Sequence, residues 1–268
     1  MNIEKKLKIL KDNIKPLESV VVAFSGGVDS TLVAKVSYDV LGAKALAITA
    51  RSETYPSYEY ENAKKIAKEI GISHITIDTS ELNIKGFAEN PPNRCYFCKS
   101  ELFGKLKEIA KEKGYKNVVD GANLDDTDEY RPGSDAAKEL NVRSPLKESG
   151  LRKSDIRDML KYLNISNWDK PSYACMSSRF PYGESISEEK LTIVAAAENY
   201  LRSLGLRQFR VRHHNTVARI EVLPEDIPVL LQSARRKELV SKFKEIGYKY
   251  VTIDMEGYRS GSMNEALK

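Results

Sequence analysis

The chain has 268 residues, of which 41% are hydrophobic and 30% charged, and its formal net charge is +5. This length can bury a large core and favours one large domain with a smaller one. No apolar run approaches the roughly 20 residues that a membrane helix needs, and the mild, well-mixed positive charge suits small anionic ligands without calling for nucleic acid.

The first 19 residues predict an amphipathic helix. The stretch MNIEKKLKILKDNIKPLES is rich in lysine but lacks a continuous apolar segment and a small-residue cleavage site. We therefore interpret it as part of the mature protein and not as a signal peptide, which predicts a cytoplasmic protein. The three cysteines are an odd number, and in a reducing compartment they argue against a disulfide framework.

Short apolar runs alternate with amphipathic segments over the first two-thirds of the chain. Glycines stand where three of these segments should end, as helix-stop chemistry predicts. The alternation predicts an α/β fold with a parallel sheet covered by helices on both faces. The expected strands are 19–24, 45–49, 74–78 and 117–120, and the expected helices are 29–41, 58–70, 98–113 and 150–164.

The pattern predicts three parts. Residues 1–164 form the nucleotide-binding domain, and residues 165–186, which have turn-forming residues and no period, form an ordered linker at the active site. Residues 187–268 form a small α+β domain for substrate binding or oligomerisation. Its expected helices are 187–204, 225–232 and 234–246, and its expected strands are 208–214, 216–222 and 248–254. Within the linker, we expect Trp168 in the core.

The junction of the first strand and helix reads VVVAFSGGVDST. Backbone N–H groups at a helix N-terminus lack partners and carry partial positive charge, so a glycine-rich turn here makes an anion site. The P-loop pattern GxxxxGK[ST] and the dinucleotide pattern GxGxxG are both absent. The candidate phosphate-binding residues are Ser25, Gly26, Gly27, Asp29 and Ser30.

This segment resembles the pyrophosphate loop of the PP-loop ATP-pyrophosphatase superfamily, whose parallel sheet is Rossmann-like. The superfamily binds ATP, transfers AMP to a substrate oxygen and releases pyrophosphate. The resemblance therefore implies ATP and Mg²⁺ as cofactors. Asp29 would bind Mg²⁺ or serve only at the helix start, and a polar glycine turn without a ligand is the alternative.

Two further strand ends fit a nucleotide site, because ligands of open α/β sheets lie at the carboxyl ends of the strands. Thr49, Ala50 and Arg51 end the second strand, where the superfamily holds adenine and ribose. The segment DGANLDD follows the fourth strand, and its Gly121 and Asp125 resemble residues that close over the nucleotide and help to hold the metal. Turn and helix-cap chemistry is the alternative for Asp125.

The cysteines form a CxxC pair, Cys95 and Cys98, and a distant third residue, Cys175. Three thiolates suit a [4Fe–4S] cluster with one iron that lacks a protein ligand. Zinc with a histidine as fourth ligand, thiol or persulfide chemistry without metal, and buried structural cysteines remain open. Sulfur insertion explains why an adenylating enzyme would carry thiolates, since a sulfur nucleophile can displace AMP from an activated carboxylate.

The segments SGGVDS, NRCYFCK, DGANLDD, WDKPSYACMSSRFPYGESI and FRVRHHNTVARIEV together resemble the LarE family. Its members are ATP-dependent sulfur transferases that make the nickel-pincer nucleotide of lactate racemase. The resemblance implies a pyridinium dicarboxylic acid mononucleotide as substrate, adenylated and converted to a thiocarboxylate. It also implies a homo-oligomer and resupply of sulfur by a small sulfide source or a sulfur-donor protein.

The resemblance also assigns roles to residues. The three cysteines look like the subset with a [4Fe–4S] cluster on Cys95, Cys98 and Cys175, although other members sacrifice the sulfur of one cysteine. Ser178 and Arg179 would act beside Cys175, and Arg179 would also help to hold substrate phosphate. Two alternate arginines of one strand share a face and can grip the substrate phosphate; a solvated strand face is the alternative for this pair, Arg210 and Arg212.

Three rival functions remain open at this point. A tRNA thiolase of the same superfamily can also use three cysteines and a cluster, but would need a broad basic surface or an RNA-binding domain. An ammonia-dependent amidating synthetase would need no cysteine. A nucleotide-binding iron–sulfur sensor would release no pyrophosphate.

Overall fold

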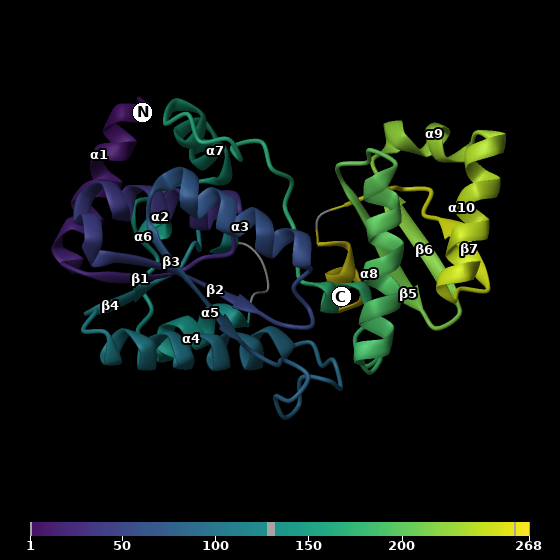
Figure 1. The fold of residues 1–268 in the computed structure, drawn as a ribbon, viewed down its shortest axis with the longest axis horizontal. Coiled ribbons are helices and arrows are strands. Elements are labelled where there is room, and N and C mark those ends of the chain that lie inside the picture. Colours follow the sequence, from purple (N-terminus) through teal and green to yellow (C-terminus); the bar gives the residue numbers. More distant parts are fainter. Residues whose placement is uncertain (1, 128–131, 260, 268) are drawn as a thin grey trace. The chain divides into compact units, whose positions relative to one another are not determined.

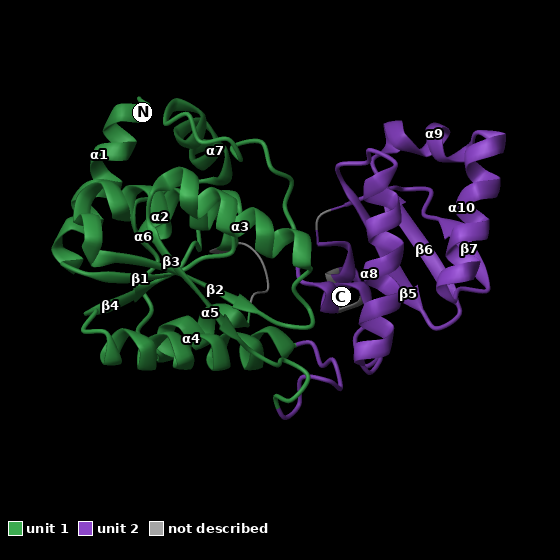
Figure 2. Cartoon of the chain, in the orientation of Figure 1, with its two compact units in different colours: residues 1–84, 93–173 green, residues 85–92, 174–268 purple. Residues whose placement is uncertain are grey.

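The computed structural model describes residues 2–127, 132–259 and 261–267. The chain forms two compact units (Figure 2). Unit 1 comprises Met1–Ile84 and Asn93–Tyr173, and unit 2 comprises Lys85–Pro92 and Ala174–Lys268. No helix in the described part of the chain is long and apolar enough to cross a lipid bilayer.

Unit 1 contains a four-stranded sheet in the order β3-β2-β1-β4, and every neighbouring pair is parallel. The predicted α/β fold with a parallel sheet is confirmed. The strands are β1 (Val20–Ala23), β2 (Ala45–Arg51), β3 (Ser73–Asp78) and β4 (Asn117–Val119). The helices are α1 (Ile3–Ile14), α2 (Val28–Leu41), α3 (Ser57–Ile70), α4 (Arg94–Glu112), α5 (Gly133–Glu139), α6 (Pro145–Glu148) and α7 (Lys153–Tyr162).

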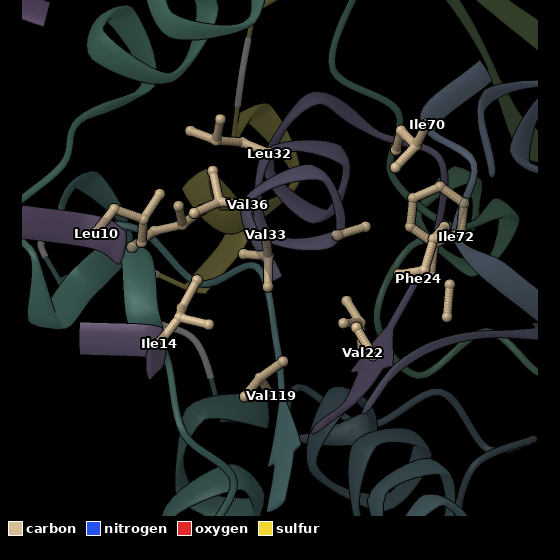
Figure 3. Packing of buried hydrophobic residues seen from close by; sticks show 14 of the residues in the cluster. Leu10, Ile14, Val22, Phe24, Leu32, Val33, Val36, Ile70, Ile72 and Val119 are labelled. Carbon is tan, nitrogen blue, oxygen red and sulfur yellow. The ribbon is translucent and has the colours of Figure 1, made fainter. Parts of the chain in front are cut away.

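Helices cover both faces of this sheet (Figure 1). Successive side chains of a strand point to opposite faces, so the continuous apolar run of β1 serves two cores. Val20 and Val22 pack in the core beneath α1, α2, α3 and α7, part of which Figure 3 shows. Val21 packs in the other core, beneath α4 and α5. The sheet is thereby fixed between two helix layers, with its carboxyl edge left for loops.

Unit 2 contains a three-stranded sheet in the order β5-β6-β7, with β5 and β6 antiparallel and β6 and β7 parallel. Helices pack on this sheet around one apolar core, which agrees with the predicted small α+β domain. The strands are β5 (Phe209–His214), β6 (Val217–Val222) and β7 (Tyr250–Ile253). The helices are α8 (Glu188–Ser203), α9 (Ile227–Leu231) and α10 (Ser233–Ile246), and a 3-10 helix spans Met176–Arg179.

Three details of the sequence prediction were wrong. Helix α4 begins at Arg94, one turn before the predicted start, so the CxxC pair lies within the helix and not ahead of it. The short helices α5 and α6 were not predicted. Trp168 is 37% exposed and not in the core. Its ring lies beneath the Lys161 ammonium, 4.9 Å from Nζ to the ring centroid.

Candidate active site

The loop between β1 and α2 approaches α3 so closely that it requires glycine. Gly26 has a φ of +62°, in the left-handed region that glycine tolerates best. A Cβ atom on Gly26 would lie 2.7 Å from Cα of Ala63 in α3. Gly27 then caps α2 with extended backbone angles. The start of α2 therefore follows directly on a tight glycine turn, the arrangement that anion sites at helix N-termini use.

Serine hydroxyls link the two ends of this loop. Oγ of Ser25 and Oγ of Ser30 are 3.2 Å apart, and the Ser25 amide donates to Oγ of Ser30. Oγ of Ser30 also donates to the Gly27 carbonyl, 3.2 Å away. From outside the loop, the Tyr55 hydroxyl donates to the Ser25 carbonyl at 2.7 Å. These bonds hold the backbone of the loop in one compact shape.

The Gly26 carbonyl is held from the other side by a segment far along the chain. Nδ2 of Asn167 donates to this oxygen at 3.1 Å and to the Thr31 hydroxyl at 2.9 Å. Nζ of Lys170 donates to the same oxygen at 3.1 Å and forms an ion pair with Glu59. Asn167 and Glu59 are both buried. The loop is thus supported by residues that no feature of the loop itself predicts.

The exit of β4 lies directly against the start of α2. A Cβ atom on Gly121 would lie 2.9 Å from the Ser30 amide nitrogen, so only glycine allows this approach. The Asp29 carboxylate forms an ion pair with Lys153 of α7 and accepts a long hydrogen bond, 3.4 Å, from Asn123. The structure therefore brings the predicted residues Asp29, Ser30 and Gly121 together at one place.

Asp125 holds the start of α7. Its carboxylate accepts a hydrogen bond from the Lys153 amide at 2.8 Å and pairs with the Arg152 guanidinium. The Lys153 amide and the Arg152 side chain lower the pKa of Asp125. In this arrangement Asp125 acts as a helix cap and adjoins the loop through Lys153, whose ammonium group pairs with Asp29.

Thr49 is buried at the carboxyl end of β2. Its hydroxyl donates to the Phe24 carbonyl at 2.8 Å and lies 2.8 Å from Nε2 of His74. Because the hydroxyl hydrogen goes to the carbonyl, Nε2 of the imidazole must be the donor. Burial, with a smaller effect of the Lys64 charge, lowers the pKa of His74 and favours this neutral form. Thr49 therefore links β2 to the residue after β1.

Ala50 and Arg51 complete β2. Ala50 is half-buried, whereas Arg51 is exposed. Nε of Arg51 donates to the Asp78 carboxylate of β3 at 2.8 Å, and its guanidinium carbon lies 5.9 Å from the Tyr60 ring centroid. The Arg51 side chain is thus available to solvent at the carboxyl edge of the sheet, where open α/β sheets bind ligands.

The CxxC pair occupies the first turns of α4. Cys95 is exposed and Cys98 is half-buried. Sγ of Cys98 donates to a Glu81 carboxylate oxygen at 3.0 Å, and that carboxylate also accepts a hydrogen bond from Thr54. Residues three apart on a helix share a face, and a helix N-terminus favours thiolates. Two sulfur ligands can therefore face one site from this helix.

In unit 2, the Cys175 segment is held by a buried arginine. The Arg179 guanidinium binds both carboxylate oxygens of Glu198, at 2.8 and 2.9 Å. Its Nη1 donates to the Ala174 carbonyl at 2.6 Å and to the Cys175 carbonyl at 3.0 Å. The Ser178 hydroxyl donates to that Cys175 carbonyl at 2.9 Å. Arg179 therefore fixes the backbone of Cys175, and the Ser178 hydroxyl binds the same carbonyl.

A second buried ion pair supports the same segment. Arg212 of β5 binds both carboxylate oxygens of Glu221 in β6, at 2.9 and 2.7 Å. Its Nη1 donates to the Ser178 carbonyl at 2.6 Å, and its Nη2 donates to the Ser262 hydroxyl at 2.9 Å. The 3-10 helix after Cys175 is thus attached to the sheet of unit 2.

Arg210 is also buried on β5. Its Nη1 donates to the Phe209 carbonyl at 2.6 Å, and its guanidinium carbon lies 5.0 Å from the Tyr258 ring centroid. Arg210 and Arg212 are 5% and 4% exposed, so the alternative of a solvated strand face is wrong. Whether the pair binds a phosphate remains a prediction.

The metal prediction rests on the cysteines. Cys95 and Cys98 belong to unit 1, and Cys175 belongs to unit 2. Among the described residues, no group of three or more His, Cys, Asp or Glu side chains is arranged to hold a metal ion.

Sequence reasoning missed several residues that support these sites. For two of them a signal exists, because each carboxylate stands on the apolar face of its helix. Glu198 follows Leu191 and Val194 at helical spacing, and Glu59 precedes Ala63 by one turn. A charged residue at such a position predicts a buried partner. No comparable signal marks the lysines and the asparagine that reach the loop, Lys153, Asn167 and Lys170.

Known proteins resemble this chain along almost its whole length. It is 49% identical to an uncharacterised protein of Synechocystis sp. over 265 residues, 99% of each chain. It is 40% identical to the pyridinium-3,5-bisthiocarboxylic acid mononucleotide synthase of Lactiplantibacillus plantarum over 262 residues, 95% of this chain and 92% of that protein. An uncharacterised protein of Methanocaldococcus jannaschii is 32% identical over 259 residues, covering 96% of this chain and 98% of that protein.

The amino-terminal part also matches a broader family. The family described as NAD synthase matches residues 2–94, which include the glycine-rich loop. The parallel sheet, the loop at the start of α2 and the near-complete similarity to the synthase agree with one another. The chain belongs to the LarE family of ATP-dependent sulfur transferases, PP-loop proteins of nickel-pincer cofactor synthesis.

Proposed function

We propose that this chain adenylates a carboxylate of pyridinium-3,5-biscarboxylic acid mononucleotide and converts it to a thiocarboxylate, for the nickel-pincer cofactor of lactate racemase. The observation that carries the proposal is the 40% identity, over 95% of the chain, to a synthase named for the corresponding bisthiocarboxylic acid. Similarity along the whole length supports this function over a tRNA thiolase. PP-loop proteins use ATP with Mg²⁺.

The first half-reaction uses the loop of unit 1. The amides and hydroxyls of Ser25–Ser30 bind the β- and γ-phosphates, and Asp29 binds Mg²⁺, which neutralises charge on the phosphates. The substrate carboxylate attacks the α-phosphorus, a new P–O bond forms, and pyrophosphate leaves. Gly121 and Asp125 line the nucleotide. Adenine and ribose lie against the end of β2, at Thr49, Ala50 and Arg51.

The second half-reaction replaces oxygen by sulfur. Hydrosulfide attacks the acyl carbon of the adenylate, a C–S bond forms, the C–O bond to AMP breaks, and AMP leaves with the electron pair. Three cysteines and no further thiol match the donor set of a [4Fe–4S] cluster with an open iron, and the CxxC pair shares one face of α4. Cys95, Cys98 and Cys175 would hold this cluster, which would supply the sulfide.

Unit 2 serves the substrate in this proposal. Arg210 and Arg212 are assigned to its 5′-phosphate by charge, while Arg179 and Ser178 orient Cys175. The two bidentate pairs with Glu198 and Glu221 support the proposal, because they hold the guanidinium planes in fixed orientations before substrate arrives.

We further propose that the protein works in the cytoplasm as a homo-oligomer, with sulfur resupplied by a small sulfide source or a donor protein. The modest net charge of +5 supports a small-molecule substrate and no nucleic acid.

The test is anaerobic purification of the full chain, followed by iron and sulfide analysis, turnover with ATP and the biscarboxylic mononucleotide, and intact mass. We expect about four irons per chain, pyrophosphate release and an unchanged polypeptide mass. A mass loss of about 34 Da, one H₂S, would show instead that Cys175 gives up its own sulfur. No pyrophosphate release with this substrate would overturn the proposal.

A further inference from the structure

One carbonyl in the ATP loop receives two hydrogen-bond donors from a single short segment. We propose that Asn167 and Lys170 are positioning residues of the ATP site, which hold the Gly26 carbonyl and so aim the Gly27 amide at the pyrophosphate moiety of ATP. The inference rests on the proposed function of the loop. Its basis is the pair of contacts from Asn167 Nδ2 and Lys170 Nζ, each 3.1 Å from the Gly26 oxygen.

Because the peptide bond is planar, the two hydrogen bonds to the Gly26 oxygen also fix the direction of the Gly27 N–H. In a planar trans peptide, the C=O of one residue and the N–H of the next point in opposite directions. Fixing the Gly26 oxygen against Asn167 and Lys170 therefore directs the Gly27 N–H away from them. Its nitrogen lies 3.4 Å from Oγ of Ser25, a long hydrogen bond that a phosphate oxygen would replace. Gly26 and Gly27 have no side chains to restrict rotation of this peptide plane. Contacts from outside the loop are therefore needed to fix its orientation.

The chemistry of Asn167 fixes which of its atoms makes the contact. A carbonyl oxygen only accepts, so the group that meets Gly26 must be the amide nitrogen. Its two hydrogens go to the Gly26 oxygen and to the Thr31 hydroxyl at 2.9 Å. Asn167 is 7% exposed, and its own Oδ1 accepts no hydrogen bond from the described residues. The two hydrogen bonds that Nδ2 donates therefore hold the Asn167 side chain in one orientation.

Lys170 adds a positive charge under the loop, balanced by Glu59. The two side chains are 16% and 6% exposed, so solvent screens the pair only in part. The ammonium group strengthens the hydrogen bond to the Gly26 oxygen, since charged donors bind more tightly than neutral ones. The same segment continues to Cys175 a few residues later.

Two variants without net charge change test the inference. Asn167→Leu removes both donors at nearly constant size. The double variant Glu59→Gln/Lys170→Met removes the ion pair without leaving a buried carboxylate unpaired. The matched control is Lys35→Met/Asp39→Asn on α2, which removes a lysine–aspartate pair that is 22% and 26% exposed.

Calorimetric titration of the full-length protein with Mg²⁺ and α,β-methylene-ATP, and separately with AMP, provides the readout. We expect each test variant to bind the ATP analogue about tenfold more weakly, the effect of losing one or two hydrogen bonds, while AMP affinity stays within about twofold. AMP has no β- or γ-phosphate for the Gly27 amide to meet. The control should match the parent for both ligands.

Each other outcome has a defined meaning. Equal weakening of both ligands would show a general structural role and overturn the inference, as would unchanged affinities in folded variants. Melting curves establish folding, and Lys170→Arg, which keeps the charge and a donor, should restore much of the lost affinity. If the parent protein itself binds no ATP analogue, the proposed function fails, and this assignment fails with it. Binding by the parent with unchanged affinities in the folded variants overturns this assignment alone.

Discussion

Arg179 and Glu198 form a buried ion pair with two hydrogen bonds, from Nε to Oε1 at 2.8 Å and from Nη2 to Oε2 at 2.9 Å. The side chains are 0% and 3% exposed. Burial alone would raise the pKa of Glu198, but the charge and hydrogen bonds of Arg179 outweigh it, and the pKa is lowered. Both groups are therefore charged inside unit 2. Arg179, held in place by Glu198, in turn fixes the position of the Cys175 carbonyl through a hydrogen bond.

Removing one partner of this pair should be strongly destabilising. Glu198→Ala leaves the Arg179 guanidinium buried without its counter-charge, and we expect the free energy of unfolding to fall by about 3–5 kcal/mol. Urea unfolding followed by circular dichroism measures it. Glu245→Ala is the control, because Glu245 and its partner Lys242 are 61% and 47% exposed, and a change of about 0.5 kcal/mol or less is expected there. A similar small loss for both variants would contradict the assignment.

Gly26→Ala should disrupt the loop between β1 and α2 through a steric clash, in addition to the strain of placing alanine at a positive φ. The new Cβ would meet Cα of Ala63 at 2.7 Å, so one backbone must move. Gly150 is the matched control: its φ is +66°, and a Cβ there meets nothing within 4 Å. Gly150→Ala should cost about 1 kcal/mol of stability and leave nucleotide affinity unchanged.

For Gly26→Ala we expect a larger loss of stability and at least about tenfold weaker binding of the ATP analogue, measured by the same titration. The difference between the two alanine variants isolates the contact with α3. Equal affinities in the two variants would show that the loop tolerates the displacement.

The sequence was sufficient to predict the elements around this loop. An apolar run, a glycine-rich turn and a helix with regular apolar spacing follow one another from 19 to 41, and local pattern decides all three. The start of α4 was missed although Asn93, a residue type that favours the N-cap position, stands directly before it; in the structure its side chain makes no cap hydrogen bond. The helices α5 and α6 span seven and four residues, too few for a period to show.

The residues of the candidate site also divide into those that local sequence predicts and those that it does not. Ser25, Gly26, Asp29 and Gly121 stand in local motifs, so their chemistry can be read from neighbouring residues. Lys153 and Asp29 form an ion pair although they are 124 positions apart in the sequence, and no local pattern around either residue predicts this contact. Such contacts depend on how the elements pack, and a single sequence carries no record of that packing.

Asp29→Asn should slow pyrophosphate release while leaving AMP binding intact. The substitution removes the charge proposed to hold Mg²⁺, and we expect the rate to fall by at least about a hundredfold, equivalent to about 2.7 kcal/mol. Asp39→Asn is a close control, since Asp39 lies on the same helix and also pairs with a lysine, Lys35. Rates are measured with saturating ATP over a series of Mg²⁺ concentrations. A rate loss that high Mg²⁺ does not change in any way, together with weakened AMP binding, would point to damage to the helix start.

His213 should make the stability of unit 2 sensitive to mild acid. Burial lowers its pKa, opposed by Glu184 and reinforced by Lys190 and His214. Its Nδ1 lies 3.2 Å from the Tyr248 hydroxyl. In the unfolded chain the imidazole has a pKa of about 6.5, so below that pH the unfolded state binds a proton that the folded state resists. The free energy of unfolding therefore falls as the pH drops below about 6.5, by at most about 1.4 kcal/mol per pH unit.

His213→Phe removes this titration and keeps an aromatic ring between Phe180 and Tyr248, whose centroids lie 5.3 and 5.6 Å from that of His213. We expect urea midpoints of the variant to change less than those of the parent between pH 7.5 and about 5. This window lies above the one for carboxylates such as Glu198, whose lowered pKa removes stability only below about pH 4.3, the usual unfolded value. Identical slopes for both proteins between these pH values would mean that His213 is not held neutral, because the proton uptake on unfolding would then be the same with and without the imidazole.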